Sequence, residues 1–170
     1  MLSILQLIVD TVAGVVGGVL LLRFWMQVIR VRPPASVGQF TFTLTDWLVR
    51  PLRRILPGVG GYDWASLIGA FLVVLLASSV LFLAGWTAQA VLLDAVLRLL
   101  HWIIYGFIGL LILEVIFSWV NPDAPLAPFV RALNYPLLRP IRRVVPPIGG
   151  IDFSVLVAFL LLQILLRVLG

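Results

Sequence analysis

Pro51-Leu52-Arg53-Arg54-Ile55-Leu56-Pro57, followed by Gly60-Gly61-Tyr62-Asp63, has a second copy later in the chain. The copy reads Pro140-Ile141-Arg142-Arg143-Val144-Val145-Pro146, then Gly149-Gly150-Ile151-Asp152, at a constant offset of 89 residues. A constant offset over so specific a stretch indicates a tandem duplication. Both copies lie between long apolar stretches, so the repeating unit is predicted to be a membrane module, with one repeat in residues 1–90 and the other in 91–170.

The composition also indicates a membrane protein. Of the 170 residues, 62% are hydrophobic and 11% are charged, and the mean hydropathy is +1.18. A soluble domain could not cover so much apolar surface with so few polar groups. The basic residues are all arginine and give a net charge of +5. Because they cluster beside apolar stretches, we expect them to face anionic lipid headgroups rather than nucleic acid.

Four stretches are long and apolar enough to be predicted as transmembrane helices. They cover about 2–29, 64–86, 97–120 and 153–169, and the fourth is near the lower length limit. Two spans per repeat return the chain to its starting side. The sequence therefore predicts an all-α membrane protein with four transmembrane helices in two parallel tandem repeats.

Arginine placement predicts the orientation of these spans. Nine arginines lie in the two long connections, whereas the opposite side holds Arg98 and Arg167. Cytoplasmic connections retain positive charge. We therefore expect both long connections to be cytoplasmic and both termini to be periplasmic, in the cell inner membrane.

Each long connection is predicted to contain a cytoplasmic amphipathic or re-entrant segment. In the first, apolar residues recur at helical spacing from Val37 to Leu48, with Trp47 as an interface anchor. In the second, the corresponding helix is predicted to be shorter, with Pro136 ending it. The prolines of the repeated motif are expected to prevent one continuous helix through the paired arginines.

The repeated motif places an acid where a membrane helix begins. Asp63 and Asp152 stand at helix-capping positions, and two interpretations remain open: a cap alone, or a cap that also pairs with an arginine. The paired arginines are interpreted as headgroup anchors or as a surface for a protein or anionic partner. They are Arg53, Arg54, Arg142 and Arg143.

At this motif the chain resembles the YggT family of small bacterial and plastid membrane proteins. The similarity extends over nearly the whole chain, and includes Gly61-Tyr62-Asp63-Trp64-Ala65-Ser66 and Ser118-Trp119-Val120-Asn121-Pro122. The resemblance implies two such domains and a link to osmotic or ionic stress tolerance and to division or envelope organisation. Plastid relatives resemble assembly factors for haem attachment. The family offers no established catalytic residues to carry over.

Charged residues inside the predicted spans need partners, because an ionised side chain in lipid costs about 3 kcal/mol. Arg23 and Glu114 lie at similar depth in the first and third spans, so an Arg23–Glu114 ion pair is predicted. Near the other side, Asp10 lies at the level of Arg98 and His101, and Asp94 can pair with Arg98 along one helix. Small residues such as Gly14 and Gly18 are expected to allow close helix contact.

These features favour a non-enzymatic membrane protein that organises partners or assists their assembly. The sequence offers no catalytic set, no metal-ligand cluster and no cofactor motif, so no catalytic, cofactor or metal residue is predicted. The expected partners are the bilayer and other membrane proteins, and self-association is open. The alternative is a small oligomeric ion channel or transporter, for which Glu114, Asp10, Ser78, Ser79 and Gln163 would serve.

Overall fold

The computed structural model describes residues 2–56, 58, 60–145 and 152–170, and in them the chain is helical. No strand occurs among these residues, so the all-α prediction is confirmed. The first half contains α1 (Leu2–Val28), α2 (Ala35–Ile55), α3 (Trp64–Ser78) and the 3-10 helix η1 (Ser79–Ala84). The second half contains α4 (Ala88–Val120), α5 (Ala127–Val144) and α6 (Ser154–Leu169).

Among the described residues, three helical stretches are long and apolar enough to cross a membrane. They are Ile4–Val28 in α1, Trp64–Ala84 in α3 with η1, and Ala88–Val120 in α4. The last of these begins at Ala88, earlier than the predicted start at about residue 97, because the helix includes the residues between the two predicted spans. Helix α6 is apolar but has 16 residues, a length of about 24 Å against a hydrocarbon core of about 30 Å.

The prediction that prolines interrupt the arginine segments is wrong. Helix α2 continues through Pro51 and both following arginines, and α5 continues through Pro136 and Pro140. All three prolines are exposed. A proline removes one backbone hydrogen bond, and on an exposed helix face water can satisfy the freed carbonyl group.

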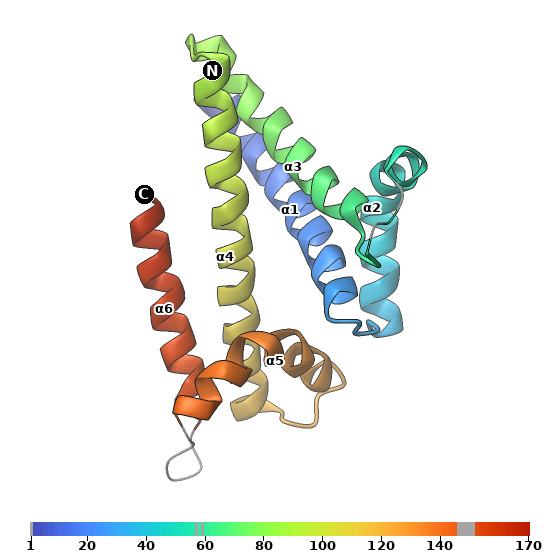
Figure 1. The fold of residues 1–170 in the computed structure, drawn as a ribbon, viewed down its shortest axis with the longest axis vertical. Helices are drawn as coiled ribbons and strands as arrows, with labels where there is room; N and C mark the ends of the chain where they lie inside the picture. Colours follow the sequence, from blue (N-terminus) through green and yellow to red (C-terminus); the bar gives the residue numbers. More distant parts are fainter. Residues whose placement is uncertain (1, 57, 59, 146–151) are drawn as a thin grey trace.

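Each half has its own apolar core. In the first, Leu20, Val49, Ala65 and Ala70 bring α1, α2 and α3 together. In the second, buried residues of α4, α5 and α6 form the other core. Figure 1 shows α4 beside both α1 and α3 of the first half and next to α5 and α6 of its own. Helix α4 therefore links the two halves.

A tryptophan makes a second link between the halves. Trp25 Nε1 on α1 donates a hydrogen bond of 2.9 Å to the Leu133 carbonyl oxygen on α5. Its ring also packs edge-on against Phe107 of α4, with the ring centroids 5.1 Å apart. An indole that satisfies its N–H and buries its ring fixes the orientation of its neighbours. Trp25 thus fixes the end of α1 against α4 and α5.

Gly17 is the glycine at which α1 approaches α4 most closely. A Cβ atom added there would lie 2.2 Å from Trp102 Cζ3, whereas at Gly18 nothing lies within 4 Å. At Gly14 the nearest Trp102 atom would be 4.0 Å away. The expected role of Gly14 and Gly18 in close packing therefore belongs mainly to Gly17, which faces the α4 side of α1.

Replacing Gly17 by alanine is expected to lower the free energy of unfolding by about 1–2 kcal/mol, because the rigid Trp102 ring must move. Gly18→Ala is the matched control and is expected to raise it by about 0.5 kcal/mol through helix propensity. Thermal unfolding of both variants in detergent measures this. Equal effects at the two positions would contradict the packing assignment.

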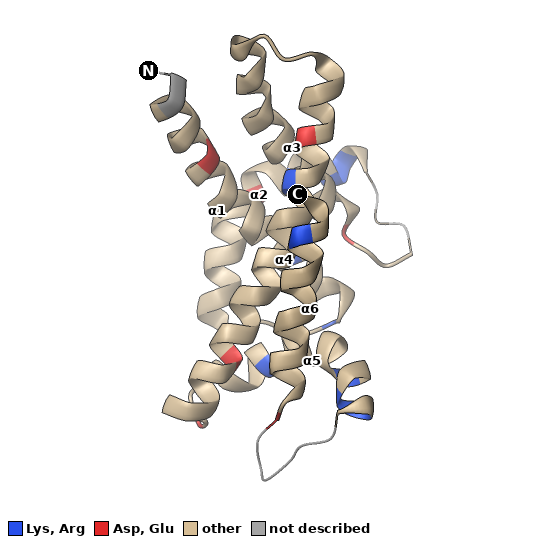
Figure 2. Cartoon of the chain, turned by 90° about the vertical axis from the view of Figure 1, so that its left-hand side faces the viewer, with Lys and Arg blue, Asp and Glu red and all other residues tan. Residues whose placement is uncertain are grey.

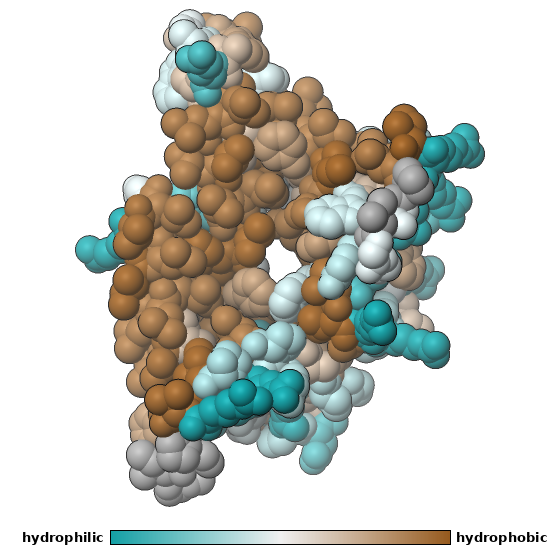
Figure 3. Space-filling model, viewed as in Figure 1, coloured by the Kyte–Doolittle hydropathy of each residue, from teal (hydrophilic) through white to brown (hydrophobic). Residues whose placement is uncertain are grey.

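The surface separates apolar helices from charged connections. Much of the helix length carries no charge, and the charged residues lie in a few groups (Figure 2). The apolar surface covers α4 and α6, while hydrophilic side chains gather beside α2 and α5 (Figure 3). On α2, Gly38, Thr41, Thr45 and Val49 are buried, and Phe40 and Trp47 are exposed. The predicted amphipathic helix is therefore present.

Candidate functional site

The first copy of the motif forms an arginine–carboxylate fork, the first cluster. Arg53 at the end of α2 donates from Nε to Asp63 Oδ1 at 3.1 Å and from Nη2 to Asp63 Oδ2. Ser66 Oγ also donates to Oδ2. The Asp63 side chain is only 3% exposed. A planar guanidinium suits two parallel hydrogen bonds to a carboxylate, so this fork joins α2 to the start of α3.

Arg23 of α1 completes the first cluster. Its Nη1 donates to Thr45 Oγ1 and to Asp46 Oδ1, each at 2.7 Å, and its Nε lies 3.8 Å from Asp63 Oδ2. The side chain is 6% exposed. Arg50 pairs with the other oxygen of Asp46 at 2.8 Å. A buried charge needs such partners, and α2 supplies them by packing along α1.

The second copy forms an arginine–carboxylate fork too, the second cluster, but here Arg142 Nε and Nη2 both approach one oxygen, Asp152 Oδ2. Arg142 Nε donates to Asp152 Oδ2 at 2.8 Å, and Ser154 donates to Oδ1 from its backbone N at 3.0 Å and from its hydroxyl. Arg142 Nη2 also donates to Glu114 Oε1 at 3.3 Å. Asn134 Nδ2 donates to Glu114 Oε2 at 2.7 Å. Arg142 therefore stands between two carboxylates.

The two clusters have the same arrangement of helices and motif residues, but the ionised residue that the long helix supplies has opposite charge in the two. Thr45 and Asn134, separated by the repeat offset of 89, contact the ionised residue of the long helix in their own half. In the first cluster that residue is the cation Arg23, near Asp63. In the second it is the anion Glu114, beside Arg142. The duplicated fork has thus acquired a cation in one half and an anion in the other.

The predicted Arg23–Glu114 pair is not formed, and this expectation is corrected. Arg23 pairs with Asp46 and Asp63, while Glu114 pairs with Arg142. Similar depth in two spans does not ensure contact, because side chains on α2 and α5 reach each charge first. Arg23 and Glu114 are thus each neutralised within their own half.

The structure gives a different answer for Asp63 and for Asp152 on whether the motif acid binds the start of its helix. Asp63 directly precedes α3, but its side chain makes no capping hydrogen bond to that helix. Asp152 precedes the N-cap residue of α6, Phe153, and accepts from the backbone N of Ser154, the first residue of that helix. Both acids pair with the first arginine of their own motif. Arginine pairing is common to the two copies, and a hydrogen bond from the start of the helix to the acid is present in the second.

The second arginine of each copy has a different environment. Arg54 and Arg143 are exposed and form no ion pair with any residue that the structure describes. The first arginine of each pair binds the following acid, and the second faces outward. Sequence reasoning treated the two as equivalent, although their positions on a helix point to different sides.

Some motif positions lie outside the described residues: Pro57, Pro146, Gly149, Gly150 and Ile151. In the first copy, Gly60 and Gly61 are described and have φ values of 69° and 78°. These left-handed conformations are the ones that glycine adopts without strain. Another residue at either position of that copy would be strained.

Both clusters lower the pKa of their carboxyl groups outside the spans. The hydrogen bond from Arg23 holds the pKa of Asp46 below its usual value. Burial raises the pKa of Asp63, but hydrogen bonds from Arg53 and Ser66 outweigh it and the pKa is lowered. Burial acts the same way on the pKa of Asp152, and hydrogen bonds from Ser154 and Arg142 lower it overall. All three carboxyl groups are therefore ionised near neutral pH.

These pKa shifts predict how stability depends on pH. A carboxyl group with a lowered pKa in the folded state contributes stability above its unfolded pKa of about 4, and loses it as pH falls through the folded value. The free energy of unfolding should therefore be flat between about pH 7 and 5 and fall below about pH 4. Thermal unfolding across this range measures it; a rise in stability on acidification would contradict the assignment.

A third polar group lies at the opposite end of the long helices. Arg98 pairs with Asp94 of its own helix at 2.7 Å, as predicted, and also with Asp10 of α1 at 2.6 Å, which lies at the expected level. Ser78 Oγ donates to Asp94. His101 Nδ1 lies 2.7 Å from the Leu97 carbonyl oxygen of its own helix. In the described residues, no His, Cys, Asp and Glu side chains gather in a group of three suited to a metal.

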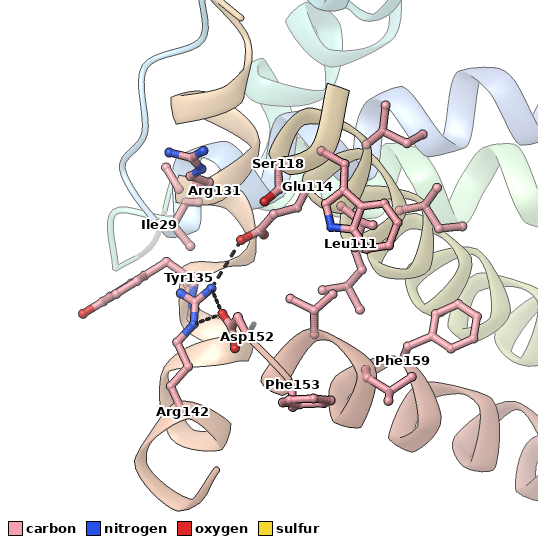
Figure 4. A pocket seen from close by; sticks show the side chains of 18 of the residues that line it. Ile29, Leu111, Glu114, Ser118, Arg131, Tyr135, Arg142, Asp152, Phe153 and Phe159 are labelled. Atoms are coloured by element: carbon pink, nitrogen blue, oxygen red, sulfur yellow. Dashed lines mark hydrogen bonds and ion pairs between the residues drawn. The ribbon is translucent and has the colours of Figure 1, made fainter. Parts of the chain in front are cut away.

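A cavity of about 1080 Å³ opens beside the second cluster. Its lining combines Glu114, Arg142 and Asp152 with apolar residues of α4 and α6, including Leu111 and Phe159. Figure 4 shows the Arg142 guanidinium between the two carboxylates at the cavity wall. The second cluster is thus accessible from this cavity, while the corresponding acid of the first cluster is buried.

Sequence reasoning missed several polar members of the clusters: Thr45, Asp46, Ser66, Asn134 and Ser154. A signal was available for two of them, because Thr45 and Asn134 are related by the repeat offset. Asn134 is fully buried, and a buried amide in an apolar helix needs a polar partner. Applying the offset to every polar residue would have identified Thr45 and Asn134 as equivalent polar positions of the two repeats.

The helical fold, the apolar spans and the paired forks define a duplicated multi-helix membrane protein. A sequence model of the CCB3/YggT family matches residues 1–84 and 93–170. The chain belongs to this family, which confirms the resemblance seen in the motif.

Relatives in several bacteria match over most of their length. The protein named YggT of Escherichia coli (strain K12) is 34% identical over 165 residues, covering 96% of this chain and 88% of the relative. A Pseudomonas aeruginosa (strain PAO1) protein is 37% identical and covers 93% and 84%. A Haemophilus influenzae (strain Rd) protein is 32% identical and covers 96% and 90%. No solved structure matches the chain.

Proposed function

We propose that the chain is a non-enzymatic protein of the cell inner membrane that organises membrane partners or assists their assembly. In this proposal α1, α3 with η1, α4 and α6 cross the membrane as two parallel repeats, with α2 and α5 on the cytoplasmic side. The observation that carries the proposal is the exposure of Arg54 and Arg143, which stay outside the forks that hold the fold together.

The exposed arginines form the proposed contact surface. Each cluster binds the first arginine of its motif, so the second does not serve the same fork. Other exposed arginines lie on the same two helices, namely Arg50, Arg131 and Arg139. Such surfaces attract anionic headgroups and acidic segments of neighbouring proteins. The proposed partners are therefore membrane proteins with acidic cytoplasmic segments, held beside an anionic bilayer surface.

Crosslinking in native membranes tests the contact surface. Changing Arg54 and Arg143 together to alanine is expected to remove crosslinked partners without unfolding the protein, because neither residue belongs to a cluster. Arg167→Ala is the matched control, since Arg167 is also exposed but lies at the end of α6. An unchanged partner set in the Arg54/Arg143 variant would contradict the proposal.

The proposed crossings are testable because the chain has no cysteine. A single cysteine introduced at Arg54, Arg143 or Thr87 is then the one site that a thiol reagent can label. In intact cells, an impermeant maleimide is expected to label position 87 and to leave positions 54 and 143 unlabelled until the membrane is opened. Labelling of position 143 from outside would contradict the crossing by α4 between positions 87 and 143 or the proposed orientation.

The ion-channel alternative has less support from the geometry. Among the residues suggested for an ion path, Glu114 pairs with Arg142, Asp10 with Arg98, and Ser78 with Asp94. Ion flux into liposomes containing the purified protein distinguishes the two roles. Flux that is abolished by Glu114→Gln would overturn the organising role.

The family resemblance suggests where the organising role matters. We expect loss of the protein to reduce growth under osmotic or ionic stress, and the Arg54/Arg143 variant to restore growth less than Arg167→Ala does. Growth of a deletion strain carrying each variant measures this. Equal restoration by both variants would separate the stress role from the arginine surface.

A further inference from the structure

A second cavity of about 410 Å³ lies beside the first cluster, and four arginines line it. We call it the arginine pocket; its charged lining is Arg23, Arg30, Arg32 and Arg53. Gln27, Phe42 and Gly61 are among the other lining residues, and no carboxylate is. The pocket lies where α1 ends and just before α3 begins.

The positive charge around this pocket is only partly neutralised. Asp46 and Asp63 pair with Arg23, Arg50 and Arg53. Arg30 and Arg32 are exposed and form no ion pair within the described part of the chain. The four lining arginines and Arg50 carry five positive charges, and Asp46 and Asp63 carry two negative charges. The difference is an excess of three positive charges.

A buried donor in the pocket wall lacks a hydrogen-bond partner. Arg23 Nε is buried and has no hydrogen-bond partner among the described residues; Asp63 Oδ2 lies 3.8 Å from it. That separation exceeds the length of a hydrogen bond. Leaving a charged donor unsatisfied costs free energy, so an acceptor from outside the chain would stabilise this wall of the pocket.

Arg30 adopts a backbone conformation that disfavours its own side chain. It has a φ of 56°, and the hydrogen bonds Arg30 N to Gln27 O and Val31 N to Met26 O close α1 in a Schellman motif. Glycine is the usual residue at this position, because a Cβ atom is strained there. A residue kept in strain at a pocket is a reason to look for a function of its side chain.

We propose that the arginine pocket binds a phosphate group. Several guanidinium groups converging on one cavity match the planar, multi-oxygen geometry of phosphate. The pocket lies at the ends of the spans Ile4–Val28 and Trp64–Ala84, which is the depth of lipid headgroups. The phosphate therefore belongs either to a phospholipid or to a soluble phosphate. This binding does not depend on the proposed organising role.

Thermal unfolding of the purified full-length protein tests the site with two probes. In one arm the protein is in neutral detergent and receives inorganic phosphate, with ionic strength matched by chloride. In the other it is in the same detergent and receives short-chain phosphatidylglycerol, with short-chain diacylglycerol as the phosphate-free lipid control. A saturating phosphate ligand is expected to raise the melting temperature by roughly 5 °C.

Two pocket variants and two controls make the test specific. Arg30→Gly and Arg32→Gln are expected to reduce the shift to less than half, whereas Arg167→Gln and Arg167→Ala remove the same charge outside both the pocket and the proposed contact surface and should keep it. Without phosphate, Arg30→Gly should melt no lower than the wild type, because glycine accepts this conformation.

Each outcome has a defined reading. A shift in both arms, lost in the pocket variants, supports a site for the phosphate group itself. A shift with phosphatidylglycerol alone supports the site and names a lipid as its source, and a shift with inorganic phosphate alone names a soluble one. The proposal is overturned if the wild type shows no shift in either arm, or if the control variants lose the shift as fully as the pocket variants.

Discussion

Asp63→Asn is expected to lower the free energy of unfolding by about 3 kcal/mol. The buried carboxylate accepts two hydrogen bonds from Arg53 and one from Ser66, and it lies 3.8 Å from the buried Arg23. Asparagine removes the negative charge that both guanidinium groups face. Thermal or denaturant unfolding in detergent measures the loss.

The second copy provides the matched control for this substitution. Asp152 makes the equivalent fork with Arg142, but its side chain is 36% exposed, against 3% for Asp63. Water screens the exposed pair, so Asp152→Asn is expected to cost only about 1 kcal/mol. Equal losses in the two copies would show that burial does not set the strength of the forks.

Arg142→Gln is expected to have the second-largest effect, a loss of about 2 kcal/mol. Its guanidinium separates Glu114 from Asp152, and without it a buried carboxylate faces a second one with no cation between them. The full penalty for breaking a buried pair is about 3–5 kcal/mol. We reduce it because Arg142 is 37% exposed. Unfolding of the purified variant measures the loss.

A double-mutant cycle separates charge repulsion from lost packing. Adding Glu114→Gln to Arg142→Gln is expected to recover at least half of the loss, because one of the two unpaired carboxylates disappears. Glu114→Gln alone should cost less, since Asn134 can still donate to the amide oxygen. Arg143→Gln, one residue away but exposed, should change the unfolding free energy by less than about 0.5 kcal/mol. Additive effects in the cycle would contradict the proposed repulsion.

The sequence predicted the helices and the motif acids well, because their signals are local. Apolar length identified α1, α3 and α4, and the repeat offset identified Asp63 and Asp152 as equivalent residues. The spacing within the motif also suggested that each acid pairs with a nearby arginine. These inferences needed no knowledge of how the helices pack together.

The features that the sequence analysis predicted wrongly depend on tertiary packing. The partners of Arg23 come from α2, which lies along α1 and supplies Thr45 and Asp46; no local pattern encodes that placement. The helices through Pro51 and Pro140 were missed for a related reason. A proline is costly where its missing hydrogen bond is buried, and only the fold shows that these prolines lie on an exposed face.

The Trp25 contact has a consequence for the ancestry of the chain. A duplicated gene of this kind is most simply descended from a half-length protein that assembled as a symmetric homodimer, in which each contact occurs twice. The residue equivalent to Trp25 in the second half is Glu114, which binds Arg142 rather than a carbonyl of α2. The Trp25–Leu133 contact therefore exists in one direction only. After fusion the two halves were free to diverge. A synthetic chain of two identical first halves would therefore not reproduce the Trp25–Leu133 contact.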